Sequence, residues 1–183
     1  MVTEKVIMAG FGGQGVMSMG QLLAYAGMID NKQVSWLPAY GPEMRGGTAN
    51  CSVIVSDQLV GSPIITQDAT CAIVMNLPSM LKFEKSLVPG GKLLINASLV
   101  DREPTRKDIE IHYVPANAIA DEKIGNPKVA NMVMLGAYLE LTHTVPVDTV
   151  VEALKKVYGV GKEQFIPLNQ KAMQEGAKAV KEA

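Results

Sequence analysis

Two short segments near the amino end combine residue types that could bind a ligand or a partner chain. The first consists of Gly10, Phe11, Gly12, Gly13, Gln14 and Gly15. It follows an apolar strand and opens a helix, the context in which a G-x-G-x-x-G pattern binds phosphate groups. Glycines let the backbone approach a ligand, and the free amides of the first helical turn carry about half a positive charge toward an anion. The segment is therefore a candidate phosphate-binding turn.

The second segment runs from Ala39 to Gly47. Its candidate site residues are Tyr40, Gly41, Pro42, Glu43, Arg45, Gly46 and Gly47. Arg45 presents a planar fork of donors that suits a carboxylate or a phosphate, and Glu43 is able to pair with it or to orient it. The same two charges also fit a salt bridge on a solvated loop, worth less than about 1 kcal/mol. An interface role and a local ion pair both remain open on the chemistry alone.

A dinucleotide such as NAD is a poor match for the glycine turn. The dinucleotide-binding fold needs an acid at the end of the second strand for the ribose hydroxyls. That place reads Ser35-Trp36-Leu37 here, and Asp30 falls before the strand. Two other interpretations stay open: contact with another phosphorylated ligand, and a structural turn whose glycines allow tight packing and hold a partner loop.

The hydrophobic pattern predicts the elements that position these segments. Strands are predicted at Lys5–Ala9, Gln33–Leu37, Thr48–Val55, Cys71–Met75, Lys92–Asn96 and Ile109–Val114, with a short return strand near Ile64. That return strand follows the turn Ser56-Asp57 and is expected to pair antiparallel. Helices are predicted at Gln14–Ile29, Lys128–Leu141, Asp148–Tyr158 and Asn169–Glu182. Asn126 and Pro127 are typical of a helix start, and the helix after them is apolar almost all round, so it should be buried.

This alternation of strands and helices predicts a three-layer α/β/α sandwich with a mixed, mainly parallel sheet, in one domain over residues 1–183. The formal charge of -1 argues against nucleic acid and an anionic membrane surface as partners. No apolar run reaches the ~18 residues of a membrane span, so a cytoplasmic location is expected. Cys51 and Cys71 lie in apolar strand segments, where buried, reduced thiols are expected.

The sequence offers no evident catalytic or metal-binding group. It has no C-x-x-C and no thiamine diphosphate signature, and His112 and His143 lie far apart without an acidic partner. Asn131 stands alone among apolar neighbours and must find hydrogen bonds, so it is expected to brace one of the two loops. A small-residue helix around Ala172, Gly176 and Ala179, together with loop and helix methionines, is expected to expose contact surface, which favours a homodimer or larger species of the isolated chain.

The two segments together resemble the gamma subunit of the 2-oxoacid:ferredoxin oxidoreductases, and more closely the 2-oxoglutarate or branched-chain type. In that family a stretch close to YGPExRGGTA follows a GxGGQG turn. Gly46 and Gly47 separate this chain from the pyruvate type, and Asn131 begins a similar NxxMxGA stretch. The resemblance covers essentially the whole chain. It implies the fold of domain III of pyruvate-ferredoxin oxidoreductase.

The resemblance also implies a function. The complex converts a 2-oxoacid, coenzyme A (CoA) and oxidised ferredoxin to acyl-CoA, carbon dioxide and reduced ferredoxin, and this chain is not expected to be active alone. The partners implied are alpha, beta and ferredoxin-like delta subunits, which carry thiamine diphosphate, magnesium and iron-sulfur clusters. Residues 10–15 would contact the CoA phosphates, and residues 40–47 with Asn131 would face the assembly. Two alternatives are a stand-alone nucleotide or CoA-binding module and the small subunit of an indolepyruvate ferredoxin oxidoreductase.

Overall fold

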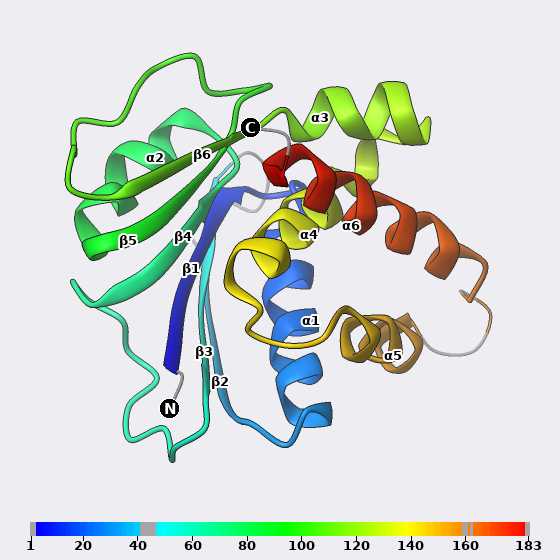
Figure 1. Ribbon diagram of the computed structural model, residues 1–183, viewed down its shortest axis with the longest axis horizontal. Coiled ribbons are helices and arrows are strands. Elements are labelled where there is room, and N and C mark those ends of the chain that lie inside the picture. The colour runs from blue at the N-terminus through cyan, green and yellow to red at the C-terminus, as the bar shows by residue number, and fades with distance from the viewer. Residues whose placement is uncertain (1–2, 41–46, 159–160, 162, 182–183) are drawn as a thin grey trace.

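A mixed β-sheet forms the centre of the protein. The computed structural model describes residues 3–40, 47–158, 161 and 163–181. Within these residues the sheet has six strands in the order β2, β3, β1, β4, β5, β6 (Figure 1). The strands are β1 Thr3–Phe11, β2 Gln33–Tyr40, β3 Thr48–Ser56, β4 Ala69–Val74, β5 Leu87–Asn96 and β6 Glu110–Val114.

Strand direction follows a simple rule in this sheet. The pairs β1–β4, β4–β5 and β5–β6 are parallel, whereas β3 is antiparallel to both of its neighbours, β1 and β2. All strands except β3 therefore run the same way, and the predicted mixed, mainly parallel sheet is confirmed. In a dinucleotide-binding fold, β1 and β2 are neighbours. Here β3 lies between them.

Helices cover the two faces of the sheet unequally. One face carries α1 Val16–Ile29, α4 Ala130–Thr142, α5 Val147–Tyr158 and α6 Ile166–Lys181, and the other carries α2 Leu77–Phe83 (Figure 1). The shorter helical pieces are η1 Glu84–Ser86, α3 Ala116–Ala118, η2 Ile119–Ile124, η3 Pro127–Val129 and η4 Glu163–Phe165. The three-layer prediction is confirmed, with a thick helical layer on one face and a thin one on the other.

Two apolar clusters correspond to the two faces. The larger lies between the sheet and the thick helical layer, and the smaller lies under α2. In α4 every residue from Ala130 to Leu139 is buried, as its all-round apolar sequence predicts. Both cysteines are free and buried. Burial raises the pKa of the Cys51 thiol to about 11, so this thiol stays protonated at neutral pH.

Two sequence predictions about surfaces and strands are wrong. The segment near Ile64 forms no strand, because local side chains take its amides: Ser62 Oγ accepts from the Ile64 amide at 3.2 Å, and Asp68 Oδ1 accepts from the Thr66 amide at 3.1 Å. The small residues of α6 are not a free contact surface. Ala172 is fully buried, and Gly176 packs against the backbone of α4 at Val133.

Helix starts were predicted only in part. Asn126 caps the helical segment after it, since its side-chain Oδ1 accepts from the Lys128 amide at 3.0 Å. A related signal, an asparagine with a proline two positions later, opens α2, where Asn76 Oδ1 accepts from the Ser79 amide at 2.9 Å. That helix was missed because it is short. No helix in the described residues is both long and apolar enough to span a bilayer.

Candidate functional site

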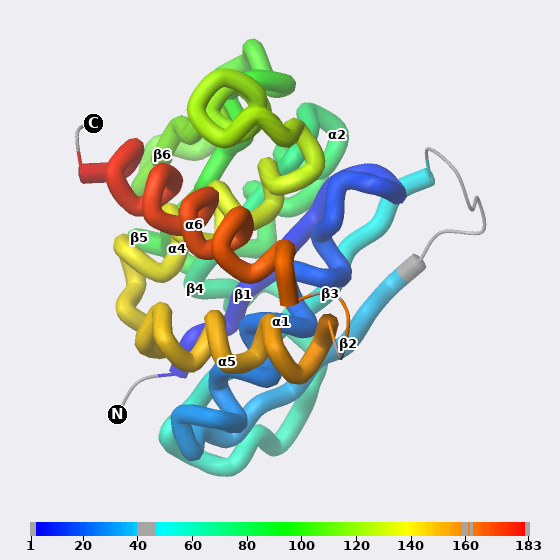
Figure 2. Tube along the Cα trace, turned by 90° about the vertical axis from the view of Figure 1, so that its right-hand side faces the viewer, coloured from blue at the N-terminus to red at the C-terminus, as the bar shows by residue number. Residues whose placement is uncertain are grey.

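The glycine-rich turn lies at the carboxyl end of β1 and meets the second segment there. β1 and β3 pair up to Phe11 and Thr48, so the residues just beyond these two must lie side by side. The Gly12 amide donates to the Gly47 carbonyl at 3.1 Å. Figure 2 shows the β1–α1 turn at the same end of the sheet as the facing ends of β2 and β3. The structure thus brings the two segments together by a backbone hydrogen bond.

Gln14 stabilises the turn from within. Its Oε1 accepts from the Phe11 amide at 2.7 Å and from Asn76 Nδ2 at 3.0 Å, and its Nε2 donates to the Met75 carbonyl at 3.3 Å. Its own amide donates to the Phe11 carbonyl at 3.1 Å. The Gln14 amide therefore closes the turn, while the expected contact of residues 10–15 with the CoA phosphates stays a prediction.

Asn131, which is distant in the sequence, braces the same turn. It is 8% exposed on α4, and its Nδ2 donates to the Gly15 carbonyl at 3.2 Å. Its Oδ1 accepts from the Met132 amide at 3.0 Å. Gly15 has φ +75°, and a Cβ on it would lie 2.7 Å from Asn131 Cγ. The expected brace is present, and it acts on the glycine-rich turn.

α1 begins one residue after this brace, at Val16. The N-cap residue is Gly15, which has no side chain to cap the helix. A hollow of about 370 Å³ opens beside this first turn, lined by Phe11, Gly12, Gly13, Gly15, Val16, Met17, Ser18 and Ala49. None of these lining residues is charged, so the amides at the helix start are the groups among them that would attract an anion.

Gly13 is an open position of the turn. Its φ is +96°, and a Cβ built there meets no described atom within 4 Å. Gly10, by contrast, is enclosed, since a Cβ there would lie 3.0 Å from Met75 Cβ and 3.1 Å from Val16 Cγ1. Two of the three pattern glycines, Gly10 and Gly15, are therefore packing positions, whereas the additional glycine between them, Gly13, is open. An anion that reaches this end of the sheet would meet Gly13 and the start of α1.

Most of the second segment lies outside the described residues. This applies to Gly41, Pro42, Glu43, Arg45 and Gly46, and to the side chain of Tyr40. The backbone of Tyr40 ends β2 opposite Ala49 on β3. The two interpretations of Arg45 therefore stay as the sequence left them.

Buried asparagines at the ends of neighbouring strands are part of the site that the sequence did not reveal. Asn76 follows β4 and is bonded to Gln14, while Asn96 ends β5 and donates to Asn117 Oδ1 at 2.7 Å. Asn96 Oδ1 accepts from the Ala116 amide at 3.2 Å. An asparagine directly after an apolar strand was the available signal. These amides stabilise the loops at the carboxyl edge of the parallel strands, where ligands of α/β proteins bind.

The described residues contain no arrangement typical of acid-base or metal chemistry at this edge. No group of three or more His, Cys, Asp or Glu side chains in the described part of the chain could hold a metal ion. His112 lies on the outer strand β6, where burial lowers its pKa and Glu110, 3.7 Å away, opposes that shift. Its buried Nε2 has no hydrogen-bond partner among the described atoms. The groups at this edge that could bind a ligand are therefore the backbone amides around the hollow beside α1.

Comparison with known families and proteins agrees with this arrangement. Residues 5–179 match the family described as pyruvate ferredoxin/flavodoxin oxidoreductase. The chain is 39% identical over 97% of its length to the ketoisovalerate oxidoreductase subunit VorA of Methanothermobacter thermautotrophicus, of which it spans only 36%. It is 34% identical to the 2-oxoglutarate synthase subunit KorC of Methanothermobacter marburgensis, with 88% of this chain and 89% of KorC aligned.

Solved structures are similar over the whole fold. The gamma subunit of a keto/oxoacid ferredoxin oxidoreductase from Geobacter sulfurreducens superimposes with a TM-score of 0.83 at 29% identity, covering 98% of this chain and 99% of that subunit. A 2-oxoglutarate:ferredoxin oxidoreductase from Magnetococcus marinus, solved with 2-oxoglutarate, coenzyme A and succinyl-CoA bound, gives a TM-score of 0.88 at 22% identity. All of this chain is covered in that match, but only 32% of the longer one.

Proposed function

Because the chain belongs to the pyruvate ferredoxin/flavodoxin oxidoreductase family, we propose that residues 1–183 are the gamma component of a 2-oxoacid:ferredoxin oxidoreductase. The hydrogen bond from the Gly12 amide to the Gly47 carbonyl is the observation that carries this proposal. It joins the glycine-rich turn to the segment that the sequence resemblance assigns to the assembled enzyme.

The reaction proposed for the complex is oxidation of a 2-oxoacid with CoA to acyl-CoA and carbon dioxide, with ferredoxin as electron acceptor. Two relatives above 30% identity carry the names ketoisovalerate oxidoreductase and 2-oxoglutarate synthase. We therefore propose a branched-chain 2-oxoacid or 2-oxoglutarate as the substrate. The two buried free thiols suit a reducing compartment, which supports a cytoplasmic location.

The redox cofactors belong on partner chains in this proposal. The magnesium ion that holds the diphosphate of thiamine diphosphate takes oxygen ligands such as carboxylates, and iron-sulfur clusters take thiolates. The only cysteines here, Cys51 and Cys71, are buried in the sheet. The described residues of this chain do not fit those groups. Alpha, beta and ferredoxin-like delta subunits are the proposed partners that would supply them.

CoA is the ligand proposed for the turn itself. Its phosphates are anions, and the first-turn amides of α1 with the open Gly13 offer an uncharged, electropositive place for them. In relatives as distant as the Magnetococcus marinus enzyme, CoA is named among the bound molecules. The contribution of this chain would be to bind and orient CoA and to complete the assembly.

Reconstitution tests the proposal. The chain is purified with co-expressed candidate partners, and ferredoxin reduction is followed with ketoisovalerate, 2-oxoglutarate and pyruvate, with and without CoA. Activity is expected only for the assembled complex. Turnover by this chain alone would falsify the subunit assignment.

Two variants of the complex separate binding from assembly. Gly12→Val should raise the KM for CoA and leave CoA-independent decarboxylation nearly unchanged, because a branched side chain obstructs the turn. Arg45→Ala should instead weaken assembly or slow both half-reactions together. A Gly12→Val complex with normal assembly and an unchanged KM for CoA would show that the turn is only structural.

A further inference from the structure

A pocket lies where the ends of α1 and α4 meet the start of α5 and the side of α6. Its volume is about 440 Å³, within the usual range for small-molecule sites. Asp30 and Lys32 line it just after α1 ends, and Glu140 lines it near the end of α4. Since α1 begins at the glycine-rich turn and has 14 residues, the pocket lies about 20 Å from that turn along the helix. It is therefore separate from the site described above.

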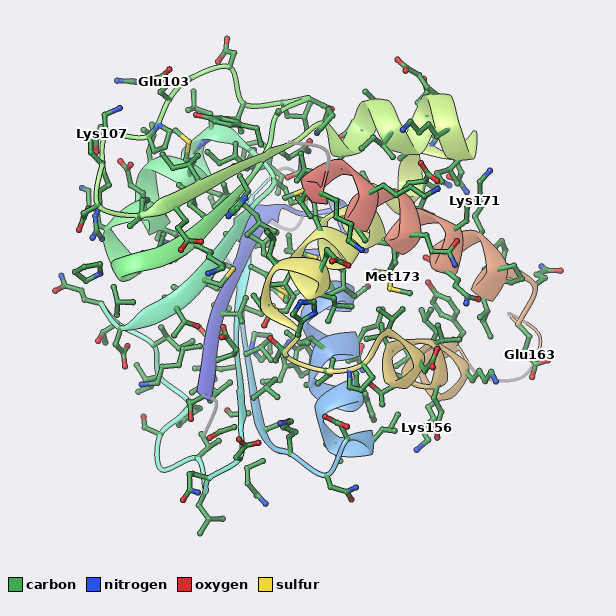
Figure 3. All side chains as sticks on the ribbon, in the orientation of Figure 1. Glu103, Lys107, Lys156, Glu163, Lys171 and Met173 are labelled. Atoms are coloured by element: carbon green, nitrogen blue, oxygen red, sulfur yellow. The ribbon has the colours of Figure 1, made fainter. Side chains whose placement is uncertain are left out.

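The buried residues that line this pocket are mostly apolar. They include Leu139, Val145 and Met173, which are buried. Figure 3 shows Met173 on the side of α6 that faces the other helices. The buried Thr144 hydroxyl is 2.7 Å from the Tyr138 hydroxyl and hydrogen-bonded to it, so it needs no partner from a ligand. The inner wall therefore suits an aliphatic group, which would leave water to pack against it.

Charged side chains of both signs line the more exposed rim of the pocket. Lys32 Nζ donates to Asp57 Oδ1 at 2.7 Å, and this bond, helped by the charge of Asp30, raises the pKa of Lys32 although burial opposes the shift. An ammonium group has three donors, so Lys32 is able to bind a second anion. Glu140 Oε1 pairs with Lys181 Nζ at 3.1 Å. A carboxylate has a second oxygen, which is able to accept from another cation.

Backbone hydrogen bonds fix both sides of this rim. The Lys32 amide donates to the Gly27 carbonyl at 2.9 Å, just after α1 ends. The His143 amide donates to the Leu139 carbonyl at 2.9 Å and ends α4 beside Glu140. A rim that is ordered before binding loses little conformational entropy when a ligand arrives. The pocket thus combines an apolar wall with a positive and a negative group on fixed backbone, a combination that matches a zwitterion with an apolar side chain.

We propose that this pocket binds an aliphatic α-amino acid, with its ammonium group at Glu140, its carboxylate at Lys32 and its side chain against Leu139. A 2-oxoacid or a fatty acid has no cation for Glu140, and an amine has no anion for Lys32. The inference goes beyond the proposed function and does not depend on it, because the pocket lies at the other end of α1 from the glycine-rich turn.

Calorimetric titration of the purified chain and of the co-purified complex with L-leucine tests the proposal. Three analogues each lack one feature: 4-methyl-2-oxopentanoate lacks the ammonium group, 3-methylbutylamine lacks the carboxylate, and glycine lacks the side chain. L-leucine is expected to bind saturably at one site per chain, and each analogue about tenfold more weakly or worse. Absence of saturable L-leucine binding, or binding of any analogue as tight as that of L-leucine, would overturn the assignment.

Variants that remove one charge assign the two ends of the ligand. Glu140→Gln and Lys32→Gln should each raise the Kd of L-leucine about tenfold. The matched controls are Glu152→Gln and Lys5→Gln, which remove the same charges from ion pairs outside the pocket and should leave the Kd unchanged. Thermal unfolding followed by circular dichroism confirms that all four variants are folded. Equal effects of the variants and their controls would assign binding to net charge and overturn the proposed placement.

The readout is distinct from that of the proposed function. Gly12→Val, which should raise the KM for CoA, should leave the Kd of L-leucine unchanged, because the turn contributes no residue to this pocket. A Gly12→Val chain that lost L-leucine binding would overturn the assignment of the ligand to the pocket at the far end of α1.

Discussion

Glycines have different roles in two regions of this protein. Where α4 crosses α6, they allow the two helix backbones to touch. In the β1–α1 turn, Gly15 packs against the Asn131 side chain, and Gly13 is open. At the crossing, a Cβ on Gly136 would overlap the Met173 backbone, and a Cβ on Gly176 would overlap the Val133 backbone. Figure 3 shows Met173 on the inner side of α6, within the helical layer. In the turn, the nearest neighbour of Gly15 is a side chain, Asn131, and Gly13 has no described neighbour at all.

The neighbour of a glycine determines how much a side chain at that position would cost. Backbone cannot move aside without shifting a whole helix, so glycines at the crossing serve the packing of the core. A side chain is able to rotate, and an open position costs only local strain. The glycine that matters most for stability is therefore outside the glycine-rich motif, and the one most available to a ligand is inside it.

The largest effect is expected at the crossing. Gly176→Ala should lower the free energy of unfolding by about 3 kcal/mol, because the added methyl group must push α6 away from α4. Urea unfolding followed by circular dichroism measures this. Gly61→Ala is the control, since Gly61 is exposed and a Cβ there meets no described atom within 4 Å. Equal midpoints for the two variants would show that the helices separate freely.

A smaller effect is expected where the neighbour is a side chain. Gly15→Ala should cost about 2 kcal/mol, part from the positive φ and part from contact with Asn131. Removing the Asn131 side chain in the same protein should recover about 1 kcal/mol of that cost. A double-mutant cycle with Asn131→Ala measures the coupling. Strictly additive costs would mean that Asn131 does not brace Gly15.

Gly13→Ala should cost less still. Only backbone strain opposes it, about 1 kcal/mol, since its φ is +96° and no described atom is near. This change should show no coupling with Asn131→Ala. A cost as large as that of Gly15→Ala would remove the distinction between the open and the packed positions of the turn.

The smallest effect is expected at the opposite end of β1, where the Lys5 ammonium pairs with Asp68. The hydrogen bond from Lys5, helped by the Thr66 amide, lowers the pKa of Asp68 below 3.8. The pair therefore stabilises the fold above pH 3.8, and this stabilisation is lost as the pH falls through the lowered pKa. Because both groups are partly exposed, Asp68→Asn should cost less than about 1 kcal/mol at pH 7.

Acid and salt titrations of that variant check the sign. The difference from the wild type should vanish below the Asp68 pKa and shrink with added salt. Asparagine keeps an oxygen that accepts from the Thr66 amide, so the variant removes charge and little else. A difference that persists at pH 2 would assign the effect to packing.

Several elements of this protein followed from the sequence because they depend on near neighbours. The apolar spacing of Val16, Met19, Leu23 and Ala26 placed one face of α1 in the core, and all four are buried. The all-round apolar sequence of α4 implied its burial, and Asn126 marked the start of the segment before it. The two motif segments were recognisable from their residue types alone.

Tertiary structure alone decided how distant parts meet. The Asn131 brace joins residues 116 positions apart, and the Gln14 side chain reaches Asn76 across 62. β3 inserts antiparallel between β1 and β2, and this order is what places Gly47 beside Gly12. Local propensity carries no information on strand order or on which helix crosses which, because these follow from packing of the complete chain. The sequence therefore determined the parts of the site, and the fold determined that the Gln14 amide closes the turn while Gly13 stays open.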